Sequence, residues 1–310
     1  MKSAVVGTGG WGKNHLRVLN ELAALSCFAE IDEQKRKFYS AKYNVKSYAN
    51  VDDLLKQGDV DTVSICTPTV THFQIAKKTI EAGVATLVEK PLTYASKDGE
   101  ELVQLASDKK VPLTIGFIER FNPAISELKK IIQDKVLGDP LLLEFHRENR
   151  WAGSIRDVGV VLDTSVHDID TARWLFDREP SVVFARTGKV ISQHEDFAAI
   201  ILGFDDQKTA FIVSNWVTPK RVRELVTVCT SGTVTADYIT QEIRLDDSEG
   251  THIPRRQWKE PLMIEYKSFL EAVEKKKRPL VTGKDGVNTT KIAEAAIASS
   301  EKGVPIYLNI

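Results

Sequence analysis

The sequence predicts an α/β domain with a doubly wound parallel sheet, followed by an α+β domain with an open, mostly antiparallel sheet. The 310 residues amount to about two domains of roughly 150 residues each. Up to about Gly116, short apolar runs alternate with amphipathic stretches, which is typical of a parallel sheet covered by helices. Beyond Phe117, β-rich runs follow one another closely, which is typical of antiparallel strands. We expect the domains to span residues 1–119 and 120–310.

The elements of the first domain follow from its apolar runs. Each run is short and rich in β-branched or small apolar residues, and an amphipathic stretch separates it from the next. The expected strands are Ala4–Val6, Ser26–Ile31, Thr62–Cys66, Thr86–Val88 and Leu113–Ile115.

The second domain combines helices with a series of strands. The expected helices are Pro123–Asp134, Val161–Leu175, Leu262–Lys276 and Gly286–Ser300. The expected strands are Leu141–Phe145, Ser181–Val190, Phe197–Phe204, Lys208–Ser214, Arg223–Cys229, Thr233–Tyr238 and Gln241–Leu245. Links as short as Asp205-Asp206 and Ser231-Gly232 predict an antiparallel meander.

The charge balance argues against nucleic acid and membrane surfaces as partners. Lys and Arg number 42 against 43 Asp and Glu, so the net charge of −1 creates no overall attraction to polyanions. The short basic run at Lys275–Arg278 is the kind of charge that favours a helix C-terminus. The apolar runs are too short for a membrane span, and the N-terminal segment lacks the pattern of a signal peptide.

The cysteines predict neither disulfides nor a metal site. Cys27, Cys66 and Cys229 lie far apart, each within an apolar or β-branched run. Buried thiols suit a reducing compartment, so we expect a cytoplasmic protein. The sequence also lacks a His, Cys and Asp cluster with metal-ligand spacing, so we expect no metal.

A glycine turn between the first strand and the first helix predicts a dinucleotide site. The segment Gly7-Thr8-Gly9-Gly10-Trp11-Gly12 places glycines at the three positions of G-x-G-x-x-G. The first glycine permits the tight turn, the second allows a pyrophosphate to approach the backbone, and the third lets the helix pack on the sheet. We therefore expect Gly7, Gly9, Gly10, Trp11 and Gly12 to bind the cofactor.

Glu30 favours NAD over NADP. It stands at the end of the second expected strand, 18 residues beyond Gly12, where a carboxylate accepts hydrogen bonds from the adenosine ribose. The same carboxylate would repel the additional phosphate of NADP. Asp32 is a competing candidate, and Lys35 or Arg36 offers an alternative in which the loop holds that phosphate.

Two segments at strand ends carry residues suited to chemistry. Thr67-Pro68 and His72 follow one strand, and Glu89-Lys90-Pro91 ends another, so both segments should face the crevice at the carboxyl edge of the sheet. Pro91 forces Lys90 into an extended conformation, which limits where its side chain points. A lysine there would stabilise the oxygen of a reacting hydroxyl.

The third segment places an acid and a base on one helix. Asp163 and His167 are four residues apart, and Asp170 follows three residues later, so all three share one face of an α-helix. An Asp beside a His orients the ring and raises its proton affinity, as a general base requires.

Together these motifs resemble those of the glucose-fructose oxidoreductase, inositol dehydrogenase and rhizopine-catabolism family, written Gfo/Idh/MocA. The resemblance covers essentially the whole chain. It rests on four motifs in order: the glycine turn, Thr67-Pro68-x-x-x-His72, Glu89-Lys90-Pro91 and Asp163-x-x-x-His167-x-x-Asp170.

The resemblance implies a Rossmann domain that binds NAD(P), a C-terminal domain whose open sheet forms a homodimer or homotetramer, and oxidation of a sugar or cyclitol hydroxyl. It further implies that Lys90 contacts the reacting hydroxyl, that His167 is the acid/base and that Asp163 orients the substrate or His167. Residues implied to line the nicotinamide and its ribose are Thr67, Pro68, His72 and Glu89. The peptide bond before Pro91 is often cis in this family.

The substrate expectation is more specific. The segments 116–123 and 147–151 resemble the branch of the family that oxidises position 3 of UDP-N-acetylglucosamine or its uronic acid. Arginines recognise diphosphates and carboxylates in a bidentate manner, and the candidate ligands are Arg120, Asn122, Arg147, Arg150 and Arg156. The alternatives are a myo-inositol 2-dehydrogenase and, from another class, a dinucleotide-binding sensor or assembly protein without catalysis.

Overall fold

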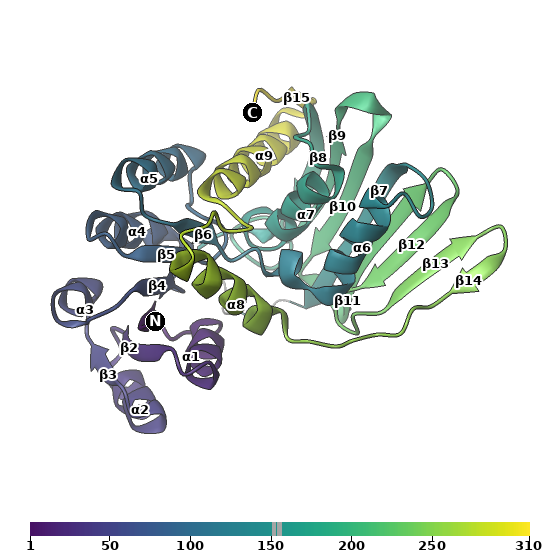
Figure 1. Ribbon diagram of the computed structural model, residues 1–310. Helices are drawn as coiled ribbons and strands as arrows, with labels where there is room; N and C mark the ends of the chain where they lie inside the picture. Colours follow the sequence, from purple (N-terminus) through teal and green to yellow (C-terminus); the bar gives the residue numbers. More distant parts are fainter. Residues whose placement is uncertain (151–152, 154–156) are drawn as a thin grey trace. The chain divides into compact units, whose positions relative to one another are not determined.

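The computed structural model describes residues 1–150, 153 and 157–310 (Figure 1). The chain forms two compact units. The first contains residues 1–116 and 262–287, and the second contains residues 117–261 and 288–310. Residues 262–287, which the sequence analysis places in the second domain, thus pack with the first unit.

The first unit is built on a six-stranded sheet with the order β3-β2-β1-β4-β5-β6. Every neighbouring pair in this sheet is parallel, as expected. The strands are β1 (Ser3–Val6), β2 (Leu25–Ala29), β3 (Lys46–Tyr48), β4 (Thr62–Ile65), β5 (Ala85–Val88) and β6 (Leu113–Ile115). Strand β3 is absent from the expected strands; it has three residues and lies at the edge of the sheet.

Helices connect these strands. They are α1 (Gly12–Glu21), α2 (Glu33–Tyr43), α3 (Val51–Gln57), α4 (His72–Glu81, preceded by the 3₁₀ turn η1, Thr69–Thr71) and α5 (Ser96–Lys109). Local chemistry starts two of them: the Asp32 side chain accepts hydrogen bonds from the backbone at the start of α2, and Asn50 does so at the start of α3.

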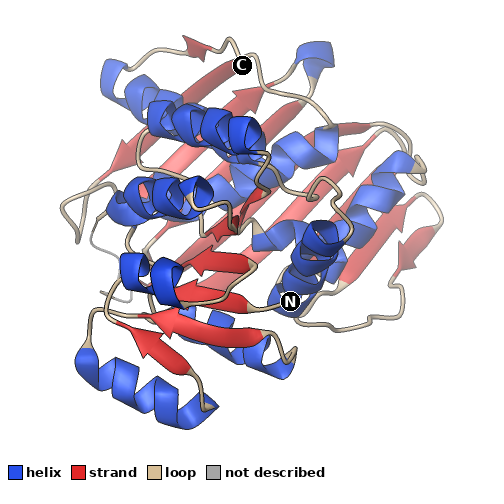
Figure 2. Cartoon of the chain, turned by 60° about the vertical axis from the view of Figure 1, so that its left-hand side comes forward, coloured by secondary structure: helices blue, strands red, loops and turns tan. Residues whose placement is uncertain are grey.

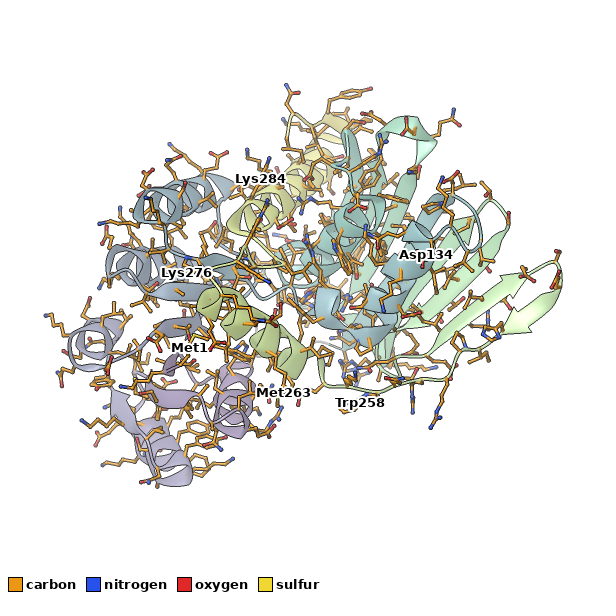
Figure 3. All side chains as sticks on the ribbon, in the orientation of Figure 1. Met1, Asp134, Trp258, Met263, Lys276 and Lys284 are labelled. Carbon is orange, nitrogen blue, oxygen red and sulfur yellow. The ribbon has the colours of Figure 1, made fainter. Side chains whose placement is uncertain are left out.

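Helix α8 (Pro261–Glu274) brings a distant part of the sequence onto the first sheet. Phe269 of α8 packs on Ala85 and Leu87 of β5. Thr86, which points to the opposite face, hydrogen-bonds Thr79 of α4. Helices therefore cover both faces of β5, which confirms the doubly wound arrangement. Met263, near the start of α8, and Lys276, just beyond its end, are labelled in Figure 3.

The second unit is built on a nine-stranded sheet with the order β14-β13-β12-β11-β7-β10-β9-β8-β15. The strands are β7 (Pro140–Arg150), β8 (Val182–Gly188), β9 (Phe197–Gly203), β10 (Thr209–Asn215), β11 (Val217–Cys229), β12 (Gly232–Asp237), β13 (Ile243–Asp247), β14 (Gly250–His252) and β15 (Ile306–Tyr307). The expected single meander is wrong in one respect, because β7 separates β10 from β11. It pairs in parallel with β10, while the other pairs in this sheet are antiparallel. The prediction of an open, mostly antiparallel sheet is confirmed.

One face of this sheet carries the helices of the second unit (Figure 2). Helix α6 (Pro123–Gln133) lies on β12, and α7 (Val166–Phe176) lies on β7 and β10. The remaining helical elements are η2 (Ile118–Phe121), η3 (Val161–Ser165), η4 (Asp205–Gln207) and α9 (Gly283–Lys302). Within the second unit, Ser299 and Ser300 of α9 accept hydrogen bonds from the backbone of β8. These bonds leave fewer backbone N–H groups of that strand unpaired.

Among residues 1–150, 153 and 157–310, no helix is long and apolar enough to cross a membrane. The same residues contain no group of three or more His, Cys, Asp or Glu side chains arranged to hold a metal ion.

Candidate active site

The glycine turn after β1 has the shape that a bound pyrophosphate requires. Gly7 has a φ of +88°, and a Cβ there would lie 2.9 Å from the carbonyl oxygen of Cys66. A Cβ on Gly12 would lie 2.1 Å from the Gly7 carbonyl oxygen, so only glycine allows α1 to start so close to the strand. At Gly9 and Gly10 a Cβ would meet nothing within 4 Å, which leaves the backbone open to a ligand.

Helix α1 begins at this turn without a side-chain cap. The N–H groups of Lys13 and Asn14 donate to the carbonyl oxygens of Gly9 and Trp11. The positive end of the helix dipole suits an anion at the helix N-terminus. The turn thus fits the pyrophosphate of a dinucleotide on its geometry as well as on its sequence.

Glu30 lies just past the end of β2, as expected. It is 7% exposed, and its Oε2 accepts hydrogen bonds from the backbone N–H of Thr8 at 2.8 Å and from Thr8 Oγ1 at 2.7 Å. Burial alone would raise the pKa of Glu30, but these bonds and one from the Asp32 N–H outweigh it and lower the pKa. Glu30 is therefore an ionised acceptor beside the glycine turn.

The alternatives to Glu30 have other roles in the structure. The Asp32 side chain caps α2 by accepting from the N–H groups of Gln34 and Lys35. Arg36 donates to the carbonyl oxygens of Glu30 and Ile31 at 2.6 and 2.8 Å. Arg36 thus shapes the loop after β2.

His72 links the two loops that follow β4 and β5. Its Nδ1 lies 2.9 Å from the Pro91 carbonyl oxygen, and its Nε2 lies 2.9 Å from the Thr67 carbonyl oxygen. The ring is 1% exposed, so it holds these loops together from inside. A direct contact of Thr67, Pro68 or His72 with the cofactor stays a prediction.

The loop after β5 contains Glu89, Lys90 and Pro91, with a cis peptide bond between Lys90 and Pro91. Glu89 is 8% exposed, and its Oε1 accepts a hydrogen bond from the Trp11 indole N–H at 3.0 Å. Trp11 belongs to the glycine turn. The first unit therefore places the expected cofactor turn and the Glu-Lys-Pro segment next to each other.

Two residues for which the sequence predicts no role, His15 and Tyr266, lie beside Glu89. His15 Nε2 lies 3.0 Å from Glu89 Oε1, and His15 Nδ1 lies 2.6 Å from the Tyr266 hydroxyl. The available signal for His15 was its spacing, three residues beyond Gly12 on the side of α1 that packs on the sheet. Tyr266 lies 251 positions from His15, and no local pattern connects them.

In the second unit, the segment around Asp163 is not the regular α-helix expected from about Val161. Val161–Ser165 forms a π-helical turn, and α7 begins only at Val166. Turns of this kind are frequent at functional sites, because they re-aim side chains within a helix. Asp163 and His167 are both half-buried, and Asp163 Oδ2 accepts a hydrogen bond from Thr164 Oγ1.

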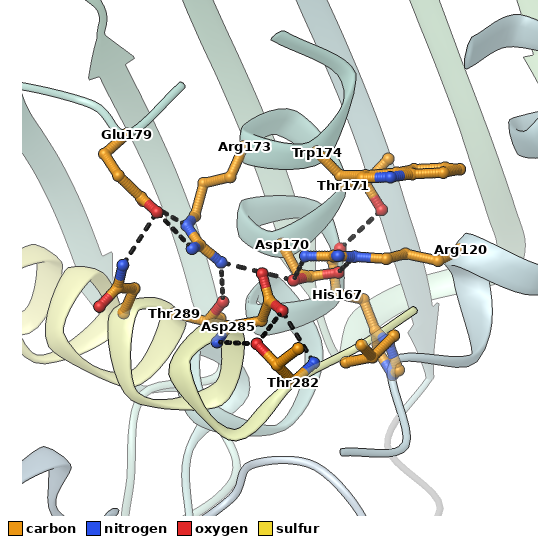
Figure 4. Close-up of polar contacts among 12 residues, drawn as sticks. Arg120, His167, Asp170, Thr171, Arg173, Trp174, Glu179, Thr282, Asp285 and Thr289 are labelled. Atoms are coloured by element: carbon orange, nitrogen blue, oxygen red, sulfur yellow. Dashed lines mark hydrogen bonds and ion pairs between the residues drawn. The ribbon is translucent and has the colours of Figure 1, made fainter. Parts of the chain in front are cut away.

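Asp170 lies in a buried network of ion pairs (Figure 4). Arg120 donates to its carboxylate from Nε at 2.7 Å and from Nη2 at 2.6 Å, with the side chains 5% and 1% exposed. Arg173 bonds Glu179 and approaches Asp170 at 3.5 Å. This network fixes α7 to the segment before α6.

The expected substrate ligands divide into two groups. Arg120 is paired with Asp170, Arg147 with Asp168 and Glu119, and Asn122 caps α6 and donates to the Tyr238 carbonyl oxygen. These side chains are buried and have structural partners, so their contact with substrate stays a prediction. Arg150 is exposed at the end of β7, and Arg156 lies outside the described residues.

Asp168 adjoins His167 and forms the other buried pair. Arg147 donates to both of its oxygens at 2.7 to 3.0 Å. Burial raises the pKa of Asp168 despite the nearby charge of Arg147. Burial alone would lower the pKa of Arg147, but the carboxylates of Asp168 and Glu119 outweigh it and raise the pKa. The Arg147–Asp168 pair therefore holds the start of α7, which contains His167, on strand β7.

Comparison with known proteins places both parts of the chain in one group. Residues 1–117 match the family model described as an oxidoreductase family with an NAD-binding Rossmann fold. Residues 125–235 match the model of the GFO/IDH/MocA C-terminal domain.

Relatives of known name extend over most of the chain. A UDP-N-acetylglucosamine 3-dehydrogenase from Acidithiobacillus ferrooxidans is 28% identical over 73% of this chain and 70% of its own. An inositol 2-dehydrogenase from Rhizobium meliloti is 25% identical over 96% of each chain. The solved structure of a levoglucosan dehydrogenase with NADH and levoglucosan has the same fold, with a TM-score of 0.92, 19% identity and full coverage of both chains.

Proposed function

The chain belongs to the Gfo/Idh/MocA oxidoreductase family, and on this basis we propose that it oxidises the 3-hydroxyl of UDP-N-acetylglucosamine or a closely related UDP-sugar. It is an NAD-dependent dehydrogenase of the kind that acts on sugar or cyclitol hydroxyls. The alternative of a non-catalytic binding protein is thereby set aside.

The observation that carries the proposal is the pairing of a dinucleotide cradle with the Glu-Lys-Pro segment in one unit. Trp11 of the glycine turn bonds Glu89, the residue directly before Lys90. Ligands of such sheets bind beyond the carboxyl ends of the strands, where both segments lie. The cofactor supplies a hydride acceptor when it is bound.

The residues of this chain then have separate tasks. Lys90 donates a hydrogen bond to the reacting hydroxyl oxygen and stabilises its developing negative charge. His167 takes the hydroxyl proton as the carbon loses its hydride, and Asp163 orients the substrate or the imidazole. Positioning of the donor carbon contributes much of the rate.

A cationic end of the second sheet supports a UDP-sugar as substrate. Arg223 of β11 pairs in register with Arg147 of β7, and Arg221 precedes it on β11, while Arg150 lies exposed at the end of β7 opposite Val217. Arg223 donates to neutral oxygens of Glu148, Val222 and Asn149. Burial, together with the like charges of Arg147 and Arg221, lowers the pKa of Arg223 to about 10. A diphosphate would relieve this repulsion.

A myo-inositol 2-dehydrogenase is the second candidate. The Rhizobium meliloti enzyme matches nearly the whole chain at an identity close to that of the UDP-sugar enzyme. A cyclitol carries no phosphate, so this function would offer no anionic ligand to Arg150, Arg221 and Arg223.

Absorbance of reduced nicotinamide tests the proposal directly. Purified protein with NAD is mixed in parallel with UDP-N-acetylglucosamine, myo-inositol and glucose. A signal with the nucleotide sugar alone supports the proposal, and a signal with inositol or glucose alone replaces the substrate while keeping the reaction class. Silence with all three would contradict the assignment to these substrates.

The open face of the second sheet supports a homo-oligomer. On this face Ile201 of β9 lies directly opposite Phe211 of β10 and Phe184 of β8. Ile201 is 42% exposed, whereas Ile200 and Ile212 on the helix-covered face are fully buried. An apolar row of this kind marks an interaction surface, and we assign it to a second copy of this chain.

A cytoplasmic location is part of the same proposal. Cys27, Cys66 and Cys229 are free thiols in the structure. Free, mostly buried cysteines are compatible with a reducing compartment.

A further inference from the structure

A chain of hydrogen bonds runs through the first unit behind the Glu-Lys-Pro segment. It starts at the Trp11 indole N–H, which is 3.0 Å from Glu89 Oε1, and continues with His15 Nε2, 3.0 Å from the same oxygen. His15 Nδ1 lies 2.6 Å from the Tyr266 hydroxyl, which in turn lies 2.8 Å from Ser64 Oγ. The chain thus connects the glycine turn, α1, β4, the end of β5 and α8.

Apart from Trp11, which is 45% exposed, these groups are shielded from water. His15 and Tyr266 are 0% exposed, Ser64 is 1% exposed and Glu89 is 8% exposed. Gly116 closes the remaining side, since a Cβ there would lie 2.6 Å from Glu89 Oε1. The carboxylate therefore has a single orientation, which its hydrogen-bond donors determine.

The hydrogens of this chain can be assigned from donor and acceptor capacity. An indole N–H is only a donor, so Trp11 makes Glu89 Oε1 an acceptor. The Tyr266 hydroxyl donates to Ser64 Oγ, so its oxygen faces His15 Nδ1. The imidazole is thus held at Nδ1 by Tyr266 and directs Nε2 at Glu89 Oε1.

Glu89 lies on the nicotinamide side of the sheet. Dinucleotides bind such sheets across the point where strand order reverses, with one mononucleotide on each half. Here the reversal lies between β1 and β4. Glu30 follows β2 on the adenosine half, so Glu89, which follows β5, belongs to the half that receives the nicotinamide.

We propose that His15 and Tyr266 are positioning residues that hold the Glu89 carboxylate for the nicotinamide half of the site, and that this carboxylate makes the protein favour the oxidised cofactor over the reduced one. The nicotinamide ring of NAD⁺ is a cation and that of NADH is neutral. A fixed negative charge in a site with little water therefore discriminates between them. The inference rests on the proposed function only for its cofactor.

Binding of NAD⁺ and NADH to the full chain without substrate tests this inference. The dissociation constants of both forms are measured by titration calorimetry for the wild type, Glu89→Gln, Tyr266→Phe and His15→Leu. His15→Gln keeps an amide donor toward Glu89, and Tyr43→Phe removes a hydroxyl elsewhere in the same unit.

We expect Glu89→Gln to weaken NAD⁺ relative to NADH by about tenfold, as a partly screened charge interaction implies. Tyr266→Phe and His15→Leu should change this ratio in the same direction, while His15→Gln and Tyr43→Phe leave it near the wild-type value. A purely structural role would weaken both forms in parallel, and an unchanged ratio in Glu89→Gln and Tyr266→Phe overturns the inference.

The test distinguishes a failure of this inference from a failure of the proposed function. If the wild type binds both forms and the variants keep its ratio of dissociation constants, the hydrogen-bonded residues do not have the role inferred here. The proposed dehydrogenase activity would then still stand. A wild type that binds neither form overturns both. If His15→Leu does not fold, Tyr266→Phe decides the question, because it keeps the buried ring.

Discussion

Thr8 donates two hydrogen bonds to one oxygen of Glu30, from its backbone N–H at 2.8 Å and from its hydroxyl at 2.7 Å. The residue inside the glycine turn thus fixes the carboxylate that follows the next strand. The position of Glu30 is therefore set by the same turn that we expect to receive the pyrophosphate.

Replacement of Glu30 should relax cofactor specificity. We expect Glu30→Ala to shift the ratio of kcat/KM values for NAD and NADP toward NADP by at least about tenfold, because the repulsion of the additional phosphate is removed. Steady-state kinetics with both cofactors measure the shift. Glu33→Ala, on the exposed side of α2, is the control. An unchanged preference would assign the selectivity to Asp32 or another group.

Replacement of Lys90 should separate catalysis from cofactor binding. Lys90→Ala removes the donor to the reacting oxygen, so we expect kcat to fall by at least about a hundredfold. The dissociation constant for NAD should stay near the wild-type value, as measured by fluorescence titration. Lys109→Ala on α5 is the control. Turnover at the wild-type rate would exclude Lys90 from the mechanism.

The Arg120 and Asp170 pair should stabilise the second unit. Arg120→Met leaves the Asp170 carboxylate buried without its bidentate partner, so we expect the free energy of unfolding to fall by about 3–5 kcal/mol. Urea denaturation measures this change, and Arg120→Met with Asp170→Leu should recover much of it. Arg178→Met removes an exposed ion pair with Asp206 and should cost far less. A stable Arg120→Met protein with a raised KM for substrate would instead support the substrate-contact expectation.

The loop between β8 and β9 should lose stability in acid through Asp196. Its carboxylate is 0% exposed and accepts bonds from the N–H groups of Val190, Ile191 and Ser192. Burial raises the pKa of Asp196, but these bonds outweigh it and hold the pKa below the usual value of 3.8. A lowered pKa stabilises the fold above pH 3.8, and this contribution is lost as the pH falls through the folded-state value.

Asp196→Asn should therefore be less stable than the wild type at pH 7 by about 1–3 kcal/mol. The difference in the free energy of unfolding between the two proteins should become smaller as the pH falls below 4, because the wild-type carboxylate then takes up a proton. Urea unfolding across this pH range measures it, with the exposed Asp205→Asn as the control. A gap that stays constant with pH would contradict the role assigned to the charge.

The apolar row of the open sheet face should hold together the homo-oligomer that we propose. We expect the double variant Ile201→Lys and Phe211→Glu to shift the protein to a smaller species, because charges at these opposite positions are costly to bury. Sedimentation velocity measures the assembly. Phe38→Glu replaces an exposed aromatic residue of the first unit and should leave the assembly unchanged. The same sedimentation coefficient for all three proteins would place the interface elsewhere.

The sequence alone determined the parallel sheet, the glycine turn and the position of Glu30. These features depend on local rules: apolar runs of strand length, glycine where a Cβ would clash, and a fixed spacing within one strand-helix-strand unit. The order of the motifs along the chain was sufficient to identify the family. Each motif by itself lies within a short stretch of the sequence.

Only the tertiary structure decided which distant side chains meet. Tyr266 reaches His15 because α8 returns to the first sheet, and β7 separates β10 from β11 although it precedes both in the sequence. Arg120 looked like a ligand for an anion, yet Asp170 provides its partner. Sequence periodicity predicts which face of an element is buried, but the partner on that face depends on how remote elements pack, so these contacts required the structure.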